Sequence, residues 1–188
     1  MRNLIFQMMV SLDGYYEGSN GEIDWHTVEK EFNDYAADLL DQVDTLIFGR
    51  KTYELMASYW PTELALNDDP LVAKKMNVLS KIVVSRTLKS ADWQNTKLIA
   101  DHVEEEIRNL KNIPGKDLAI FGSSDLSLSL LEYGLIDEIR IFVNPVLLGK
   151  GKPLFQGLKT KINLELTQTR TLKSGLVMLY YKPAKKYI

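Results

Sequence analysis

Three apolar segments of the sequence end in residues that could bind a phosphate group. The first, Asp44–Phe48, stops at Gly49 and continues into Arg50, Lys51 and Thr52. A strand that turns through glycine into a helix presents free backbone N–H groups and the positive end of the helix dipole at one point. The Arg50 guanidinium adds paired donors for the same oxyanion. The junction predicts a phosphate-binding turn, although any α/β turn that needs a glycine and a solvated charge has the same pattern.

Two further segments repeat this plan. The apolar run 117–121 leads through a glycine into two serines, and the β-branched run 81–84 ends in a hydroxyl and a guanidinium. The residues at these two ends are Phe121, Gly122, Ser123, Ser124, Ser85 and Arg86. Because all three ends carry groups that favour anions, together they predict a nucleotide cofactor.

The length and composition are those of an ordinary globular protein. The chain has 188 residues, of which 45% are hydrophobic and 26% charged, and this predicts a single domain over residues 1–188. The 23 basic and 25 acidic residues are interspersed and give a net charge of −2. No basic field is therefore expected that could hold a nucleic acid.

The sequence also argues against metal and membrane chemistry. It contains no cysteine, and its two histidines, His26 and His102, share no metal-ligand spacing, so no metal site is predicted. The apolar stretch 1–10 lacks a cleavage site and is far shorter than the roughly 20 residues that span a bilayer. We therefore expect a cytoplasmic protein with no membrane or nucleic-acid partner.

Strands and helices alternate along the first two thirds of the chain, which is typical of a parallel βαβ sheet. The predicted strands are 1–10, 44–48, 81–84, 96–100, 117–121, 136–144, 161–172 and 176–182. The predicted helices are 27–43, 51–58, one that ends near residue 79, one that begins at a capping box of Asp101 and Glu104, and one that runs from Ser123 to Gly134. Residues 61–70 and 145–153 are expected to be loops, and the last two strands form an antiparallel hairpin.

Several motifs in this order resemble the dihydrofolate reductase superfamily, in particular the branch similar to the reductase domain of riboflavin-biosynthesis proteins and its stand-alone bacterial relatives. The matching stretches are Val10–Gly14, Gly49–Tyr53, Tyr59–Pro61, Ser85–Thr87, Phe121–Ser123, Gly134–Glu138 and Asn144–Phe155. They cover nearly the whole chain. The resemblance implies a three-layer α/β/α fold with a mixed eight-stranded sheet, a bound NADPH and hydride transfer to a small pyrimidine- or pterin-like heterocycle.

The resemblance also assigns cofactor contacts. It implies that Gly49, Arg50, Lys51 and Thr52 hold the phosphates of NADPH. Arg50 would lie near the 2′-phosphate and Thr52 near the pyrophosphate. Other implied contacts are Ser85 and Arg86 at the adenosine end, and Phe121, Gly122, Ser123, Ser124 and Leu126 along the pyrophosphate and nicotinamide ribose. Cations gathered at the adenosine end favour NADPH over NADH, since the extra phosphate adds up to two negative charges.

Two positions depart from the family pattern. Typical dihydrofolate reductases have a Gly-Gly pair where this chain has Gly122 and Ser123, whereas the riboflavin-type relatives share the Gly-Ser form. The carboxylate that holds the pteridine ring in dihydrofolate reductases falls on Asn33 here, with Asp34 beside it. Folate reduction is therefore not predicted, and 5-amino-6-(5-phosphoribosylamino)uracil is one candidate substrate.

The residues of the substrate side are less clearly marked. Asp13, just beyond the first strand, is the candidate catalytic proton donor or substrate anchor, although Asp-Gly is equally typical of a turn. Trp25, Tyr53 and Trp60 are candidates to stack on a planar substrate, although aromatic residues at such positions also occur in cores or interfaces.

Three alternatives remain open at this stage. The segment Gly149–Lys152 has the composition of a phosphate loop, but it lacks the spacing and the following helix, so a loop between strands is expected. The protein could be a non-catalytic NADPH-binding module, or an interaction module that kept the fold. Relatives of this branch are commonly homodimers, and the alternating strand 136–143 is a candidate interface.

Overall fold

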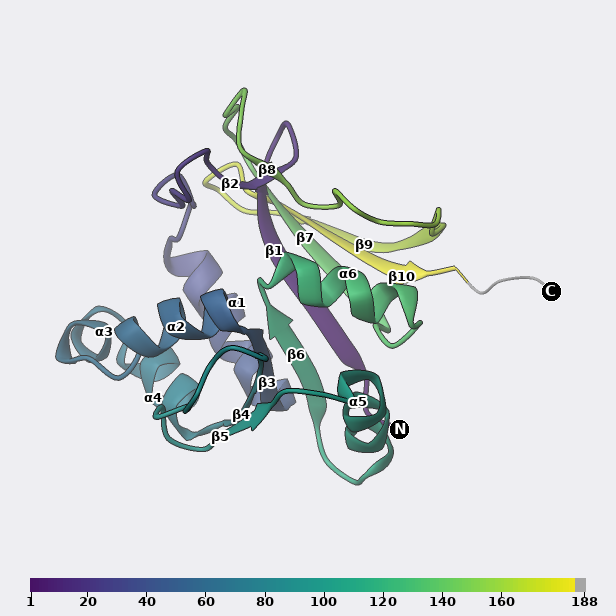
Figure 1. The fold of residues 1–188 in the computed structure, drawn as a ribbon. Coiled ribbons are helices and arrows are strands. Elements are labelled where there is room, and N and C mark those ends of the chain that lie inside the picture. Colours follow the sequence, from purple (N-terminus) through teal and green to yellow (C-terminus); the bar gives the residue numbers. More distant parts are fainter. Residues whose placement is uncertain (185–188) are drawn as a thin grey trace.

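The computed structural model describes residues 1–184, which form an eight-stranded sheet between two layers of helices (Figure 1). The strand order is β5-β4-β3-β6-β1-β7-β10-β9. The strands are β1 Leu4–Ser11, β3 Val43–Gly49, β4 Ser80–Val84, β5 Thr96–Ile99, β6 Asp117–Phe121, β7 Glu138–Asn144, β9 Leu164–Thr171 and β10 Val177–Pro183. The first six strands in this order, from β5 to β7, are parallel to one another. β10 pairs antiparallel with both β7 and β9. The predicted mixed sheet and its C-terminal hairpin are confirmed.

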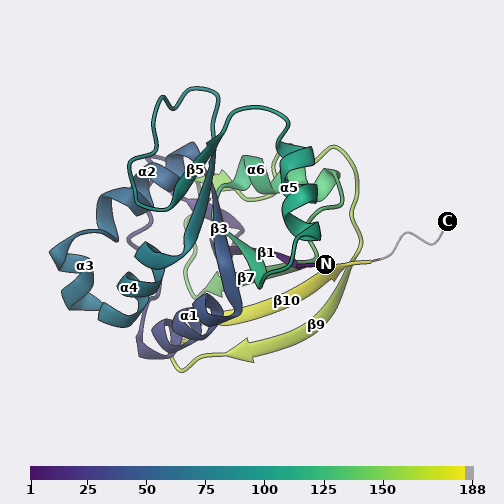
Figure 2. The same ribbon diagram turned by 90° about the horizontal axis from the view of Figure 1, so that it is seen from below.

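The helices cover both faces of the sheet, as Figure 2 shows from below. They are α1 Lys30–Gln42, α2 Arg50–Tyr59, α3 Glu63–Asp68, α4 Pro70–Val78, α5 Val103–Asn112 and α6 Ser124–Glu132. Leu39 of α1 and Met76 of α4 pack in one core cluster, whereas Ile107 of α5 and Leu131 of α6 pack in the other. The three-layer α/β/α architecture predicted from the sequence is therefore present.

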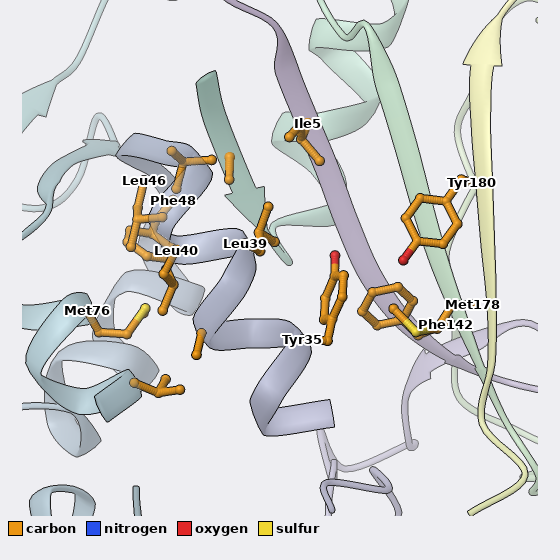
Figure 3. Packing of buried hydrophobic residues seen from close by; sticks show 14 of the residues in the cluster. Ile5, Tyr35, Leu39, Leu40, Leu46, Phe48, Met76, Phe142, Met178 and Tyr180 are labelled. Carbon is orange, nitrogen blue, oxygen red and sulfur yellow. The ribbon is translucent and has the colours of Figure 1, made fainter. Parts of the chain in front are cut away.

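Side chains that alternate along each strand build the two cores. In β3, Leu46 and Phe48 contribute to the cluster under α1, while Ile47 between them contributes to the cluster under α5 and α6. On α1, Tyr35 and Leu39 lie four residues apart and are buried on the same face, toward β1 (Figure 3). Burying one such side chain contributes about 1.5–3 kcal/mol, so this packing holds α1 on the sheet.

Local structure differs from the sequence-based prediction at three places. The expected loop 61–70 contains α3, because the Thr62 side chain accepts a hydrogen bond from Ala65 N and caps the helix. The link 145–153 contains β8, Lys152–Pro153, which pairs with β2, Tyr15–Glu17.

The third difference is a wrong prediction, the capping box at the start of α5. The N-cap residue is His102, in the left-handed conformation with φ of 54°, and no side chain caps the helix. Asp101 instead pairs with Arg86 at 3.3 Å, and Glu104 pairs with Arg108 at 2.9 Å. The two residues of the expected capping box thus form two separate ion pairs.

A buried lysine joins β4 to the end of α4. Lys81 is 1% exposed, and its ammonium donates hydrogen bonds to the carbonyl oxygens of Met76, Asn77 and Leu79 at 2.7–3.0 Å. The ammonium also lies 4.5 Å from the ring centre of Trp93. The last carbonyls of a helix have no partner within the helix, so Lys81 supplies the donors that this buried end needs. Burial lowers the pKa of Lys81 to about 8.

We expect Lys81→Met to lower the free energy of unfolding by about 2–4 kcal/mol, because one buried and two partly buried carbonyls would lose their charged donor. Urea denaturation followed by circular dichroism would measure this. The matched control is Lys97→Met on the neighbouring strand β5, where the lysine is exposed and pairs with Glu106. The control should change stability by less than about 0.5 kcal/mol. Equal effects of the two substitutions would contradict the assigned role of Lys81.

Candidate functional site

A cavity of about 1160 Å³ lies at the carboxyl ends of β3, β4 and β6. This is at the upper end of the volumes of small-molecule sites, and parallel sheets bind ligands at this edge. Most of the residues predicted to hold a cofactor line it. They are Gly49, Arg50, Lys51, Thr52, Ser85, Arg86, Ser123, Ser124 and Leu126. The structure therefore brings together the three strand ends that the sequence singled out.

Phe121 and Gly122, also predicted as cofactor contacts, do not line this cavity. Phe121 is half-buried and packs against the core cluster under α1. Gly122 lies behind Thr52 with a φ of +74°, and a Cβ atom there would come within 3.3 Å of Thr52 Cγ2. These two residues support the wall of the cavity from behind.

Ser123 connects the two glycine junctions. Its Oγ accepts a hydrogen bond from Gly49 N at 2.6 Å and donates one to Thr52 Oγ1 at 2.9 Å. Ser123 N also donates to Thr52 Oγ1, at 3.1 Å. Ser123 has a φ of 59°, a left-handed conformation that is uncommon for residues other than glycine. One side chain thus holds the start of α2 against the start of α6.

The Thr52 hydroxyl has one hydrogen that it can donate to a ligand. Its oxygen already accepts two hydrogen bonds from Ser123, and a hydroxyl carries a single hydrogen. Since Thr52 lines the cavity, that hydrogen can be donated to a ligand oxygen.

Three helix N-termini border the cavity without a side-chain cap. They belong to α2, α5 and α6, whose N-cap residues are Gly49, His102 and Ser123. Away from the cavity, α3 and α4 are capped by the side chains of Thr62 and Asp69, whereas α1 has no side-chain cap. Uncapped first-turn N–H groups and the helix dipoles together favour an anionic ligand.

Three arginines that line the cavity form exposed ion pairs. Arg50 pairs with Glu54 on the next turn of α2 at 3.2 Å, in addition to the Arg86 and Arg108 pairs described above. Exposed pairs of this kind contribute little to stability, about 0–1 kcal/mol. A phosphate that enters the cavity can therefore draw Arg50 or Arg86 away from its present partner at low cost.

Asp13, the predicted proton donor, anchors a loop. Its carboxylate accepts hydrogen bonds from Gly149 N at 2.7 Å and Leu148 N at 3.2 Å. A hydrogen bond from the Ser11 side chain, followed by those backbone N–H groups, lowers the pKa of Asp13. These contacts fit the turn interpretation of Asp13, and its role as proton donor or substrate anchor stays a prediction. The same carboxylate holds the start of the glycine-rich segment 149–152, whose last residue, Lys152, begins β8.

The three aromatic candidates are not brought together. Tyr53 is 4% exposed, its hydroxyl accepts a hydrogen bond from Trp93 N at 3.0 Å, and it lies away from the large cavity, so its ring packs in the core. Trp25 donates from its indole to Glu22 O at 3.0 Å, in the loop before α1. Trp60 is half-buried at the end of α2, where its indole N–H lies 3.1 Å from Met56 Sδ.

Part of the cavity wall had no signal in the sequence. Tyr16 and Glu17 of β2 line one end, and His102, Glu104 and Arg108 at the start of α5 line the other. Tyr16 follows the Asp-Gly turn closely and could have been suspected on that ground. The α5 residues could not, because only the left-handed turn at His102 directs them to the cavity.

Within residues 1–184, no cluster of three or more His, Asp or Glu side chains is arranged to hold a metal ion. In the same part of the chain, none of the helices has the length and hydropathy of a membrane span.

Residues 2–178 match the family model described as the RibD C-terminal domain. The chain belongs to the RibD C-terminal domain family. Uncharacterized protein YyaP of Bacillus subtilis (strain 168) is 40% identical over 184 residues, which cover 96% of this chain and 94% of YyaP. The resemblance to the riboflavin-type branch found in the sequence is thereby confirmed.

Solved structures share the fold of this RibD C-terminal domain. A putative riboflavin biosynthesis protein from Shewanella sp. PV-4 superimposes with a TM-score of 0.75 at 24% identity, covering 98% of this chain and all, 100%, of that chain. Dihydrofolate reductase from Enterococcus faecalis, solved with NADP(H), superimposes with a TM-score of 0.65 at 16% identity, covering 97% of each chain. The RibD C-terminal domain described here therefore has a reductase fold.

We expect Ser123→Ala to lower the free energy of unfolding by about 1–3 kcal/mol, because the Gly49 N–H loses its acceptor and Thr52 loses one donor. Ser123→Gly is the matched variant. It removes the same hydroxyl, but glycine adopts the left-handed conformation without strain. The free energy of unfolding of this variant should therefore exceed that of the alanine variant by about 1 kcal/mol. The glycine variant should therefore be the more stable of the two in urea denaturation. An alanine variant as stable as the wild type would contradict the bridging role.

Proposed function

We propose that this chain is an NADPH-dependent reductase that transfers a hydride to a small heterocyclic substrate, pyrimidine- or pterin-like. The observation that carries the proposal is the convergence of three uncapped helix N-termini and the Arg50 and Arg86 side chains on one cavity. Membership of the RibD C-terminal domain family and the reductase fold support it.

The donors of the cavity fit a dinucleotide. Arg50 would hold the 2′-phosphate, the Thr52 hydroxyl hydrogen and the first N–H groups of α6 would hold the pyrophosphate, and Ser85 and Arg86 would flank the adenosine. NADPH supplies the hydride when it is bound. The protein contributes orientation of the reacting groups and exclusion of water.

The substrate side carries no folate-type carboxylate at the expected position. Asp34 is exposed and pairs with Lys30 at 2.8 Å, on the outer face of α1. Folate reduction is therefore not proposed, and a uracil such as 5-amino-6-(5-phosphoribosylamino)uracil is the candidate suggested by the family resemblance.

We further propose that the chain acts as one domain, residues 1–188, in the cytoplasm and as a homodimer. β7, which contains most of the predicted interface 136–143, is paired with β1 on one edge and β10 on the other. Any contact through this segment would therefore use its side-chain face and not its backbone edge. Sedimentation velocity of the purified protein tests the assembly.

The first experiment is a titration of the protein with NADPH and NADH, followed by nicotinamide fluorescence, and then an assay of NADPH oxidation with a panel of pyrimidines and pterins. Preferential NADPH binding with oxidation by at least one compound is the expected result. Binding without oxidation across the panel would favour the non-catalytic NADPH-binding module. Absence of binding would overturn the proposal.

We expect Arg50→Ala to weaken NADPH binding about tenfold or more and to leave NADH binding nearly unchanged, because a charge-assisted contact to the 2′-phosphate contributes about 1.5–3 kcal/mol. Calorimetric titration with both cofactors would measure the difference. Lys30→Ala on α1 is the control, since it removes the same charge outside the cavity. Equal losses for the two cofactors would contradict the assignment of Arg50.

A further inference from the structure

Four polar side chains form a continuous hydrogen-bonded chain on the face of the sheet that α1 covers. Arg140 of β7 donates from Nη1 to the Tyr35 hydroxyl of α1 at 2.9 Å and from Nε to Glu138 Oε1 at 2.6 Å. The Tyr35 hydroxyl in turn donates to Gln7 Oε1 of β1 at 2.8 Å. Figure 3 shows Tyr35 rising from α1 with its hydroxyl at the tip, toward β1. The chain thus crosses three elements and ends at Gln7.

The inner members of this chain are held firmly. Arg140 and Tyr35 are each 8% exposed, and the guanidinium lies 5.2 Å from the ring centre of Tyr180. Burial raises the pKa of Tyr35, so its hydroxyl stays protonated. Glu138 is engaged by the guanidinium, which balances its charge. Buried polar groups of this kind are costly unless each is satisfied, so the network has one stable arrangement.

The arrangement decides which way the Gln7 amide faces. Arginine can only donate, so the Tyr35 oxygen accepts from Arg140 and its single hydrogen must go to Gln7. The partner atom on Gln7 is therefore the carbonyl oxygen, as the geometry has it. The amide nitrogen, with its two hydrogens, points away from Tyr35. Gln7 therefore ends the hydrogen-bonded network with an uncharged amide group that can donate hydrogen bonds.

Gln7 lies beside the cofactor junction. In the sheet it is aligned with Phe121 on one side and Arg140 on the other, and its backbone oxygen accepts a hydrogen bond from Gly122 N at 3.1 Å. It is half-buried, so solvent reaches it. On the same face of the sheet, half-buried apolar side chains of β1, α1, α2, β6 and the residue that follows α2 pack against the core cluster under α1. They are Met9, Phe32, Met56, Trp60 and Phe121.

We infer that Gln7 determines substrate specificity by donating hydrogen bonds from its amide nitrogen to a ring carbonyl oxygen, and that Tyr35 and Arg140 are positioning residues that hold the amide in this orientation. The inference rests on the proposed function, because it places the heterocycle next to the Gly122 junction. A neutral donor backed by a buried guanidinium favours an oxo-substituted ring. It disfavours a ring that bears amino groups and a positive charge, since such a ring would leave the donor unpaired.

The test uses two matched probes on the protein saturated with NADPH. They are 5,6-diaminouracil, which has two ring carbonyls, and 2,4,5,6-tetraaminopyrimidine, in which amino groups replace those carbonyls. We expect calorimetry to show at least about tenfold tighter binding of the uracil, as is typical of a site built around one hydrogen bond. Equal affinities, or no binding of either probe to the NADPH complex, would overturn the inference.

Substitutions in the hydrogen-bonded network show which of its residues cause the preference between the two probes. Gln7→Glu replaces the donor by a carboxylate and should reverse the preference, so that the tetraaminopyrimidine binds more tightly than the uracil. Gln7→Leu should weaken binding of the uracil without strengthening binding of the tetraaminopyrimidine. Tyr35→Phe should bring the affinity ratio close to one. Tyr59→Phe is the matched control, because its hydroxyl bonds Asp68 on the surface at 3.0 Å, and it should keep the wild-type ratio.

NADPH affinity separates this inference from the proposed function. Unchanged NADPH binding by the Gln7 variants shows that the fold and the cofactor cavity are intact. If the wild type fails to bind NADPH, the proposed function fails. If NADPH binds but the probe preference does not depend on residue 7, only the inference about Gln7 is overturned.

Discussion

The contact between the two glycine junctions is the constraint on which the candidate site depends. Ser123 joins the start of α6 to Gly49 and Thr52 at the start of α2. Small residues are required on both sides, because a Cβ atom at Gly49 would lie 3.1 Å from Ser123 Oγ and one at Gly122 would lie 3.3 Å from Thr52 Cγ2. With the junctions this close, two helix N-termini face the same cavity, and the electrostatic preference for an anion follows.

The two halves of the sheet supply different parts of the site. The parallel half, from β5 to β6, places its carboxyl ends at one edge, where they border the large cavity. The half that contains β1, β7 and β10 carries the buried chain from Arg140 to Gln7. β1 and β6 are neighbours, so the polar end of that chain lies next to the cofactor junction. If NADPH binds as proposed, its nicotinamide and a polar anchor for the acceptor would be held by adjacent strands of one sheet.

The departures from the dihydrofolate reductase pattern agree with this arrangement. Serine in place of the second glycine adds the bridge to Thr52. The carboxylate of the first helix is absent at Asn33, while the buried Tyr35 on the same helix connects Gln7 to Arg140. No carboxylate therefore stands at that position of the first helix. The fold is kept, and the polar chemistry under the substrate side differs.

Much of this could be predicted from the sequence, because strand alternation, helical spacing and glycine junctions depend on residues that are close in the chain. The eight strands and the phosphate-type motifs at residues 49–52 and 122–124 follow from those local signals, whereas their assembly into one mixed sheet was implied by the family resemblance. The capping box at Asp101 failed, although it is also local, because the left-handed turn at His102 displaced the start of α5.

Only the tertiary structure decided which side chains meet across long separations. It gave Asp13 its partners in the loop at Gly149, buried Tyr53 against Trp93, and joined Gln7, Tyr35 and Arg140 from three elements. These contacts connect residues separated by up to 136 positions. No local pattern encodes them, because their geometry depends on how whole strands and helices pack, whereas each element forms from the preferences of its own residues.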